Sequence, residues 1–263
     1  MVTGGFGFIG SSLIPDLLSR GHLVTVADHR IREKMENLED SYSHDNLEFI
    51  TLDLLDYKKL KEVTKRKDLI FHLAANVDVR KGQVDTEIDF LNNIVATRNV
   101  LESMRSSDTC KKIIFTSSSV VYGENATMPT PENYGPLKPI SLYGASKLAC
   151  EALVSGYVGT FGINAVIFRL ANVVGPRSDH GVISDFFRKL KKSKGNRLEI
   201  LGDGTQKKSY LYIDDCIEAL LLGLNDFGSH LEILNVGSDD QVDIDTIAQI
   251  IIEKLGVHPE IFY

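Results

Sequence analysis

The chain has 263 residues, enough to bury a substantial core as one large domain or as a core domain with a smaller lobe. Its formal net charge of -7 argues against a general attraction to nucleic acid, and its three widely spaced cysteines argue against a disulfide framework or a metal knuckle. No stretch approaches the roughly 20 apolar residues of a membrane span, and Met1 leads straight into a glycine loop without a targeting segment. We therefore expect a cytoplasmic protein with no nucleic-acid, membrane or metal partner.

Short apolar runs alternate with longer amphipathic stretches over the first two thirds of the chain. The runs are typical of buried strands, and the stretches are typical of helices. Strand and helix in repetition predict parallel strands joined by right-handed crossovers, and hence a doubly wound α/β sheet with helices on both faces. The predicted strands are residues 23–27, 47–52, 69–74, 112–116 and 165–170.

After about residue 175 the alternation loosens, but no linker or internal repeat separates the later elements from the earlier ones. We expect residues 1–175 to form the main domain and residues 176–263 to form a smaller lobe interleaved with it. The elements predicted in this lobe are helices at 183–194, 214–224 and 244–255, a strand at 233–236, and a Gly-Asp-Gly turn at 202–204.

A glycine loop, with Gly4, Gly7 and Gly10 at three-residue intervals, runs into an apolar-periodic helix at 11–18. Gly4 permits a tight turn, Gly7 lets the backbone approach a pyrophosphate, and Gly10 lets helix and strand pack closely. The helix N-terminus then faces the anion. A glycine triplet alone is also typical of a plain tight connection.

Asp28 ends the next apolar strand, 18 residues beyond Gly10, where a carboxylate receives the ribose hydroxyls of NAD. A 2′-phosphate would be repelled there, which favours NAD over NADP. Arg30 leaves NADP open, because a guanidinium so close could accommodate that phosphate.

Two further strand ends fit a dinucleotide. Asp53 can accept from an adenine amino group while Leu54 packs on the ring, or Asp53 can instead cap a helix ahead of Tyr57. Leu73, Ala74 and Ala75 end the fourth strand, where small residues suit close approach of the dinucleotide or plain helix packing.

A tyrosine and a lysine stand four residues apart at the start of a helical pattern. This spacing places Tyr143 and Lys147 on one helix face, with Cβ atoms about 5 to 6 Å apart. The lysine, together with a positive nicotinamide ring, favours the phenolate and so a general base. Alone, the pair is also typical of ordinary helix surface. Ser118 ends the fifth strand at the carboxyl edge, where such folds bind ligands, although serines there also cap turns.

These motifs together give the chain a resemblance to the NAD-dependent epimerases and dehydratases of the extended short-chain dehydrogenase/reductase family, which have a Rossmann fold. Several motifs in the family's order are far more specific than any one of them. They are the glycine loop, Asp28, residues 72–75, Asn93 with Thr97, residues 117–123, Tyr143 with Lys147, and residues 169–176, 212–215 and 235–237.

The resemblance implies a role for each matching residue. Ser118, Tyr143 and Lys147 would form the catalytic triad. Asn93 would order the site, and Asn172 would touch the sugar nucleotide. Lys208 stands where the family often has an arginine that grips a phosphate, which keeps the charge but loses the bidentate geometry. The residues expected to bind NAD are Gly4, Gly7, Phe8, Ile9, Gly10, Asp28, His29, Asp53, Leu54, Leu73, Ala74, Ala75, Asn93, Tyr143 and Lys147.

The implied reaction removes a hydride from C4 of a UDP-sugar and returns it to the other face, interconverting UDP-glucose and UDP-galactose. The family's dehydratases carry Asp-Glu after the strand-end hydroxyl, whereas Ser119 and Val120 follow Ser118 here, so an epimerase ranks above a dehydratase. A decarboxylase, another sugar-nucleotide epimerase and a non-catalytic NAD-binding protein stay open.

Two features depart from the family. Only Met1 and Val2 precede the glycine loop, and the chain stops at Tyr263, so we expect a fragment whose missing C-terminal part helps complete the sugar pocket. The resemblance also implies a homodimer that pairs through the helices holding Asn93 and Tyr143. The apolar residues of those helices could equally form intramolecular core, and they are Ile94, Val100, Leu101, Leu148 and Leu153.

Overall fold

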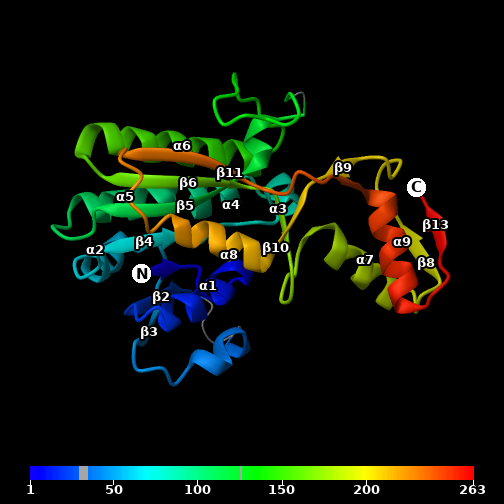
Figure 1. Cartoon of the computed structure of the whole chain (residues 1–263), viewed down its shortest axis with the longest axis horizontal. Coiled ribbons are helices and arrows are strands. Elements are labelled where there is room, and N and C mark those ends of the chain that lie inside the picture. Colours follow the sequence, from blue (N-terminus) through cyan, green and yellow to red (C-terminus); the bar gives the residue numbers. More distant parts are fainter. Residues whose placement is uncertain (30–34, 125) are drawn as a thin grey trace. The chain divides into compact units, whose positions relative to one another are not determined.

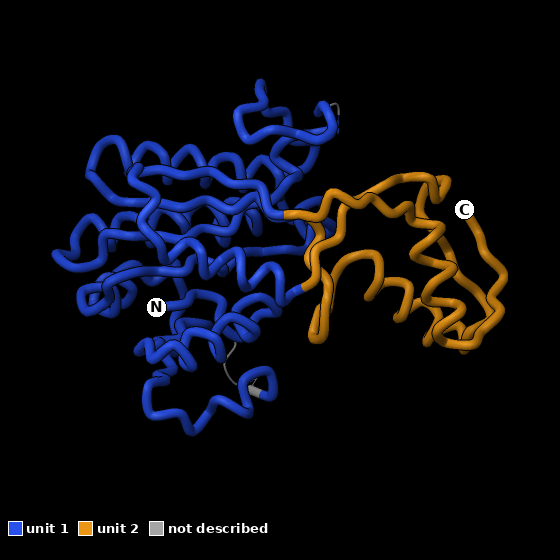
Figure 2. The backbone as a smooth tube through the Cα atoms, viewed as in Figure 1, with its two compact units in different colours: residues 1–170, 213–236 blue, residues 171–212, 237–263 orange. Residues whose placement is uncertain are grey.

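The computed structural model describes residues 1–29, 35–124 and 126–263. These residues divide into two compact units (Figure 2). Unit 1 comprises residues 1–170 and 213–236, and unit 2 comprises residues 171–212 and 237–263. The chain therefore leaves unit 1, returns to it for one helix and one strand, and leaves it again.

Unit 1 is built on a seven-stranded parallel sheet with the order β11-β6-β5-β4-β1-β2-β3 (Figure 1). The strand order reverses between β1 and β4, which is where doubly wound sheets bind their ligands. The predicted doubly wound fold is confirmed. The strands are β1 (Val2–Thr3), β2 (Val24–Asp28), β3 (Leu47–Thr51), β4 (Leu69–His72), β5 (Lys112–Ser118), β6 (Asn164–Leu170) and β11 (Leu231–Val236).

Helices cover both faces of this sheet. α1 packs with α8, whereas α2 and α6 pack with α5, as expected for right-handed crossovers that run in opposite directions from the centre. The main helices are α1 (Phe8–Ser19), α2 (Tyr57–Thr64), α5 (Ala96–Arg105), α6 (Leu142–Phe161) and α8 (Ile213–Leu222). The shorter ones are η2 (Met35–Ser41), α3 (Val79–Val84), α4 (Glu87–Asp89), η3 (Phe90–Val95) and η4 (Ser119–Tyr122).

The strand β1 is only two residues long, yet it lies inside the sheet, between β4 and β2. Val2 pairs with Val26 on one side and with Phe71 on the other, and all three side chains are buried. A two-residue strand is too short to show a periodic pattern in the sequence. Its position can be predicted only from the glycine loop that follows it. The core beneath it is apolar and continuous with α5 and α6.

Unit 2 has its own apolar core, which includes Phe186, Leu190, Ile247 and Ile251. These residues recur at helical spacing on two helices that pack together. The elements of unit 2 are α7 (Gly181–Lys192), α9 (Ile244–Leu255) and the strand pairs β7 (Asn172–Val174) with β10 (Tyr210–Tyr212), β9 (Lys207–Lys208) with β12 (Val242–Asp243), and β8 (Arg197–Glu199) with β13 (Glu260–Phe262).

No helix in the described ranges has the length and apolar character needed to cross a membrane. The same described residues contain no group of three or more histidine, cysteine, aspartate or glutamate side chains arranged to hold a metal ion.

Candidate active site

A glycine loop joins β1 to α1. Gly4 has a φ of 68°, a left-handed conformation that favours glycine, and a Cβ there would lie 2.8 Å from the Cα of Ala74. A Cβ on Gly10 would lie 2.5 Å from the carbonyl oxygen of Gly4. The loop therefore packs backbone against backbone, in the way that a dinucleotide-binding turn requires.

The N-terminus of α1 leaves backbone donors for an anion. Gly7 is the N-cap residue, and no side chain among the described residues caps the first turn, which also holds no acidic residue. A Cβ on Gly7 would meet the carbonyl oxygen of Gly4 at 3.1 Å, so a side chain has little room there. The N–H groups of Phe8, Ile9 and Gly10 could therefore receive a pyrophosphate.

Asp28 ends β2 and is buried beside the glycine loop. The backbone N–H of Phe6 donates to Asp28 Oδ2 at 3.2 Å, and His29 Nδ1 lies 3.8 Å from Asp28 Oδ1. A carboxylate in this place suits the hydroxyls of a ribose and repels a 2′-phosphate. Arg30, whose guanidinium left binding of NADP open as an alternative, lies outside the described residues.

Asp53 and Leu54 follow β3. Asp53 is exposed, and its Oδ1 accepts from the backbone N–H of Leu55 at 2.9 Å. The helix cap belongs to Asp56, whose Oδ1 accepts from the N–H of Lys59 at 3.1 Å. The alternative prediction that Asp53 caps this helix is therefore wrong. The contact of Asp53 with an adenine stays a prediction.

His72 ties together β1, β4 and α5. Its Nδ1 lies 2.8 Å from Thr3 Oγ1, and its Nε2 lies 3.0 Å from Thr97 Oγ1. Burial, and then the charge of Lys147, lower the pKa of His72 to about 3, so the ring is neutral at pH 7. The half-buried residues 73–75 follow it at the carboxyl edge of the sheet.

The strand β5 and the helix α6 bring together the three residues predicted to be catalytic. Ser118 is the last residue of β5, and its hydroxyl lies close enough to the phenol of Tyr143, in the first turn of α6, to influence the pKa of that phenol. Lys147 lies one turn further along, with its Nζ 5.9 Å from the ring centroid of Tyr143. This ammonium is buried and donates to the carbonyl oxygen of Thr116 at 2.9 Å.

The pKa of Tyr143 differs from the expectation of a phenolate favoured by its lysine neighbour. Burial raises the pKa of Tyr143 to about 12, and the nearby hydroxyl of Ser118 opposes that rise. Burial also lowers the pKa of Lys147, whose ammonium is bonded to Thr116. The chain alone therefore keeps the phenol neutral, and a further positive charge is needed to make it a base near pH 7.

Asn93 lies on η3, a segment of π-helix, and both ends of its side-chain amide are bonded within the chain. Its Nδ2 donates to Ser146 Oγ at 2.8 Å, and its Oδ1 accepts from the backbone N–H of Asn76 at 2.8 Å. Ser146 in turn donates to the carbonyl oxygen of Tyr143 at 2.8 Å. This chain of bonds fits the expected role of ordering the site.

Two groups of buried polar residues beside the site were not predicted from the sequence. Asp89 Oδ1 accepts from Asn76 Nδ2 at 2.8 Å and from Asn93 Nδ2 at 3.3 Å. Glu151 forms a buried ion pair with Arg169, with Arg169 Nη2 2.7 Å from Glu151 Oε2. The available signal was spacing, because Asp89 stands four residues before Asn93 and Glu151 stands four after Lys147.

The two residues expected to touch substrate belong to unit 2, where they share a neighbour. Asn172 begins β7, and its Nδ2 donates to the carbonyl oxygen of Ser209 at 3.0 Å. Lys208 is the residue before Ser209 and pairs with Val242 across β9 and β12. The fold of unit 2 thus brings Asn172 close to Lys208.

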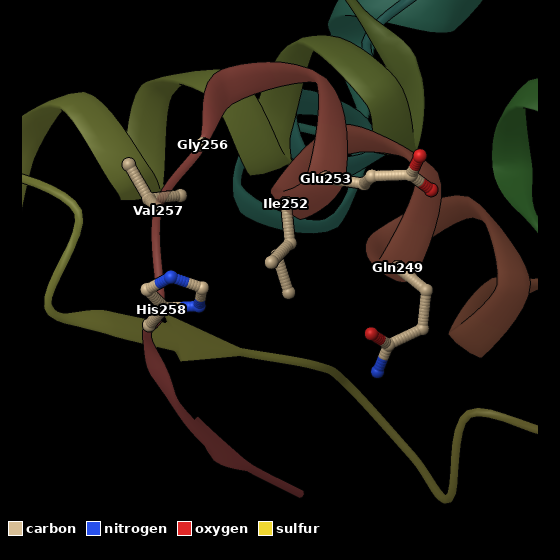
Figure 3. Close-up of a pocket in the computed structure, with 6 residues that line it drawn as sticks. All are labelled: Gln249, Ile252, Glu253, Gly256, Val257 and His258. Atoms are coloured by element: carbon tan, nitrogen blue, oxygen red, sulfur yellow. The ribbon is translucent and has the colours of Figure 1, made fainter.

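Two hollows in the structure lie away from the predicted residues. Figure 3 shows the first, of about 410 Å³, around the C-terminal end of α9 in unit 2, with His258 and Glu253 among the residues that line it. The second, of about 440 Å³, lies in unit 1 beside Lys112 and Asn164, where β5 and β6 begin. Neither contains a residue predicted to be catalytic.

Comparison with known proteins agrees with this geometry. A UDP-glucose 4-epimerase from Mycolicibacterium smegmatis is 33% identical over 226 residues, which are 84% of this chain and 71% of the relative. A UDP-N-acetyl-alpha-D-glucosaminuronate decarboxylase from Bacillus cytotoxicus is 34% identical over 259 residues, which are 95% of this chain and 78% of the relative.

A solved structure agrees as well. A crystal structure of UDP-galactose 4-epimerase superimposes with a TM-score of 0.88 at 42% identity, covering 99% of this chain and 84% of that one. Residues 1–237 match the family described as NAD dependent epimerase/dehydratase. The glycine loop, the bare α1 N-terminus and Asp28 fit the dinucleotide that this family uses. The chain therefore belongs to the NAD dependent epimerase/dehydratase family, and NAD is its cofactor.

Proposed function

We propose that the protein is a UDP-glucose 4-epimerase, which interconverts UDP-glucose and UDP-galactose by transient oxidation at C4 of the sugar. The observation that carries this proposal is that Ser118, at the carboxyl end of β5, lies close to the phenol of Tyr143 in the first turn of α6. Lys147 lies buried on the same helix face, and the glycine loop stands at the switch point of the same sheet. These groups suit oxidation of a sugar hydroxyl.

When bound, NAD supplies the hydride acceptor and donor and a positive charge at the nicotinamide ring. Tyr143 takes the proton from the sugar 4-hydroxyl and later returns it. Ser118 hydrogen bonds the reacting oxygen, and Lys147 fixes the nicotinamide ribose. Because burial raises the pKa of Tyr143 to about 12, the phenol becomes an effective base only beside that positive charge.

Other reactions of the family differ in the groups that they need. A dehydratase needs an added acid and base to eliminate water, and Ser119 and Val120 next to Ser118 provide neither. The similarity to a decarboxylase is as strong as that to an epimerase, so a uronate substrate is the second candidate.

Unit 2 would supply nucleotide contacts in this proposal. Lys208 would offer a positive charge to a phosphate, and Asn172 would hydrogen bond the sugar nucleotide. A lysine meets a phosphate as a point charge, so we expect Lys208→Arg to lower the KM for the UDP-sugar rather than to raise it.

The test is a turnover assay of the purified chain against UDP-glucose, UDP-galactose, UDP-N-acetylglucosamine and UDP-glucuronate. Product sugars are separated by chromatography, and bound nucleotide is identified after denaturation. Conversion between UDP-glucose and UDP-galactose supports the proposal. Release of carbon dioxide from the uronate supports the decarboxylase instead, and NAD binding without any turnover supports a non-catalytic NAD-binding protein.

Tyr143→Phe is the sharpest single variant for this assay. Removing the phenol oxygen should lower kcat by roughly 10²- to 10⁴-fold, the contribution of a general base. Tyr157→Phe is the matched control, because its phenol donates to Glu102 Oε2 at 3.0 Å further along the same helix. A Tyr143→Phe protein that turns over like the Tyr157→Phe protein would refute the proposed base.

We propose that the chain forms a homodimer through α5 and α6. Of the apolar residues considered from the sequence, Val100 and Leu101 are fully buried in the core of unit 1 and cannot serve as an interface. Leu91 on η3, which leads into α5, and Phe161 at the end of α6 stay exposed. Sedimentation equilibrium should give twice the chain mass, and a monomer at all concentrations would contradict the dimer.

A further inference from the structure

Three residues from separate sequence motifs, Tyr122, Arg169 and Asn235, have no part in the proposed chemistry. The sheet brings two of them into one row. Arg169 pairs in register with Ser117 of β5 on one side and with Asn235 of β11 on the other. The next row along contains Ser118, so this polar row lies directly before the proposed catalytic serine.

One side of the Arg169 guanidinium holds the helix α6. Nε donates to Glu151 Oε1 at 3.1 Å and to Oε2 at 3.2 Å, and Nη2 donates to Oε2 at 2.7 Å. Ser117 Oγ donates to the same carboxylate. Glu151 stands eight residues after Tyr143 and four after Lys147, which places all three on one helix face.

The other side of the guanidinium holds the segment between η4 and α6. Arg169 Nη1 donates to Tyr122 Oη at 2.8 Å and to the carbonyl oxygen of Glu132 at 3.0 Å. Tyr122 donates to Asn235 Oδ1 at 2.7 Å, and Asn235 Nδ2 donates to the carbonyl oxygen of Thr130 at 2.8 Å. A single arginine thus bonds the residue at the start of the stretch that leads into α6 and a residue in its middle.

A buried ion pair is weak evidence for stability, because desolvation of both charges offsets their attraction. Arg169 and Glu151 are 4% and 5% exposed at their side chains, so this offset applies fully here. What the bidentate fork does provide is fixed geometry. With Lys147 bonded to Thr116, successive turns of α6 are held against the end of β5.

We propose that Arg169 is a positioning residue that, through Glu151 and Tyr122, sets the distance between the Tyr143 phenol and Ser118. This inference rests on the proposed roles of Tyr143 and Lys147. It assigns a shared purpose to the Tyr122, Arg169 and Asn235 motifs, namely to hold the catalytic helix in register with the strand end, without contact with substrate or cofactor.

The first experiment compares Arg169→Lys with a control of matched instability. Lysine keeps the positive charge but cannot form the two-sided fork, so kcat should fall by about 10²-fold, the effect of a misplacement near 1 Å, while the KM for UDP-sugar changes by less than about twofold. Leu60→Ala removes a fully buried core side chain on α2, and it should lower the melting temperature without lowering kcat.

Tyr122→Phe is the second variant, in case Arg169→Lys does not fold. Phenylalanine keeps the ring beneath the guanidinium, whose carbon lies 4.9 Å from the ring centroid, and removes only the hydroxyl that joins Arg169 to Asn235. We expect kcat to fall by about tenfold, less than in Arg169→Lys, because the Glu151 side of the fork persists.

Hydrogen exchange followed by mass spectrometry gives a readout that needs no turnover. Both variants should exchange faster at the first turn of α6 and at residues 130–132, and Leu60→Ala should not. The inference is overturned if, at the same loss of melting temperature, both variants lose no more kcat than Leu60→Ala does. It is also overturned if hydrogen exchange at these two segments stays unchanged. Full turnover in Tyr143→Phe would instead overturn the proposed chemistry.

Discussion

The two sides of the site in unit 1 are built from different parts of the chain. Beside β1 the backbone forms the surface, since Gly4 and Gly10 leave no room for a Cβ. Beside β5 buried polar side chains form it, with Lys147, Glu151 and Arg169 all nearly inaccessible. The backbone side, beside β1, depends on positions without a side chain, which the sequence shows as glycines. The side-chain side, beside β5, depends on partners that only the fold brings together.

The largest expected effect depends on pH and comes from β4, the strand between β5 and β1. His72 bonds Thr3 next to the glycine loop, and burial followed by the charge of Lys147 lowers its pKa from 6.5 to about 3. The folded state thus binds this proton more weakly than the unfolded state. Its contribution to stability is full above pH 6.5 and is lost as pH falls toward 3, at about 1.4 kcal/mol per pH unit and roughly 5 kcal/mol over the whole window.

The measurement is urea unfolding at pH values from 7 to 4. His72→Gln should be less stable than wild type at pH 7 but should lose stability less steeply below pH 6.5. His22→Gln, at an exposed position, should keep the wild-type slope. If wild type and His72→Gln show parallel curves, then the pKa of His72 is not lowered in the folded state.

The next effect tests the backbone side. A Cβ on Gly10 would lie 2.5 Å from the carbonyl oxygen of Gly4, and backbone cannot move aside as a flexible side chain can. Gly10→Ala should therefore lower the free energy of unfolding by about 1 to 3 kcal/mol, and it should abolish NAD binding measured by calorimetry.

Gly156 offers the matched control on α6, because a Cβ there would meet nothing within 4 Å. Gly156→Ala should raise the free energy of unfolding by about 0.5 to 1 kcal/mol and leave NAD binding intact. Equal shifts in the two variants would show that the close packing of the loop does not matter.

These differences explain how much could be predicted from the sequence. The parallel strands are visible as apolar runs, and the glycine loop is visible because few residues other than glycine tolerate its conformation. The partners of Glu151 could not be seen, because Arg169 and Ser117 are distant in sequence and meet only across the sheet. The pKa of Tyr143 was also out of reach, since spacing places Lys147 on its face but does not reveal burial or the bond to Thr116.

The return of the chain to unit 1 could not be predicted from the sequence for a similar reason. The helix α8 and the strand β11 were predicted as elements, but their partners were not. β11 pairs in register with β6 over six residues from Leu231 to Val236, and α8 packs on α1. The sequence of one strand alone does not show which distant strand it will pair with.

The smallest expected effect sharpens the comparison at the start of α6. Ser141 is the N-cap residue, and its Oγ accepts from the N–H of Gly144 at 3.0 Å, one residue beyond Tyr143. Ser141→Ala should cost about 1 kcal/mol of unfolding free energy, as should Asp56→Ala at the N-cap of α2. Only Ser141→Ala should also lower kcat, because a frayed first turn loosens the phenol beside Ser118. If both cap variants keep wild-type kcat, the position of the Tyr143 phenol does not depend on an ordered first turn of α6.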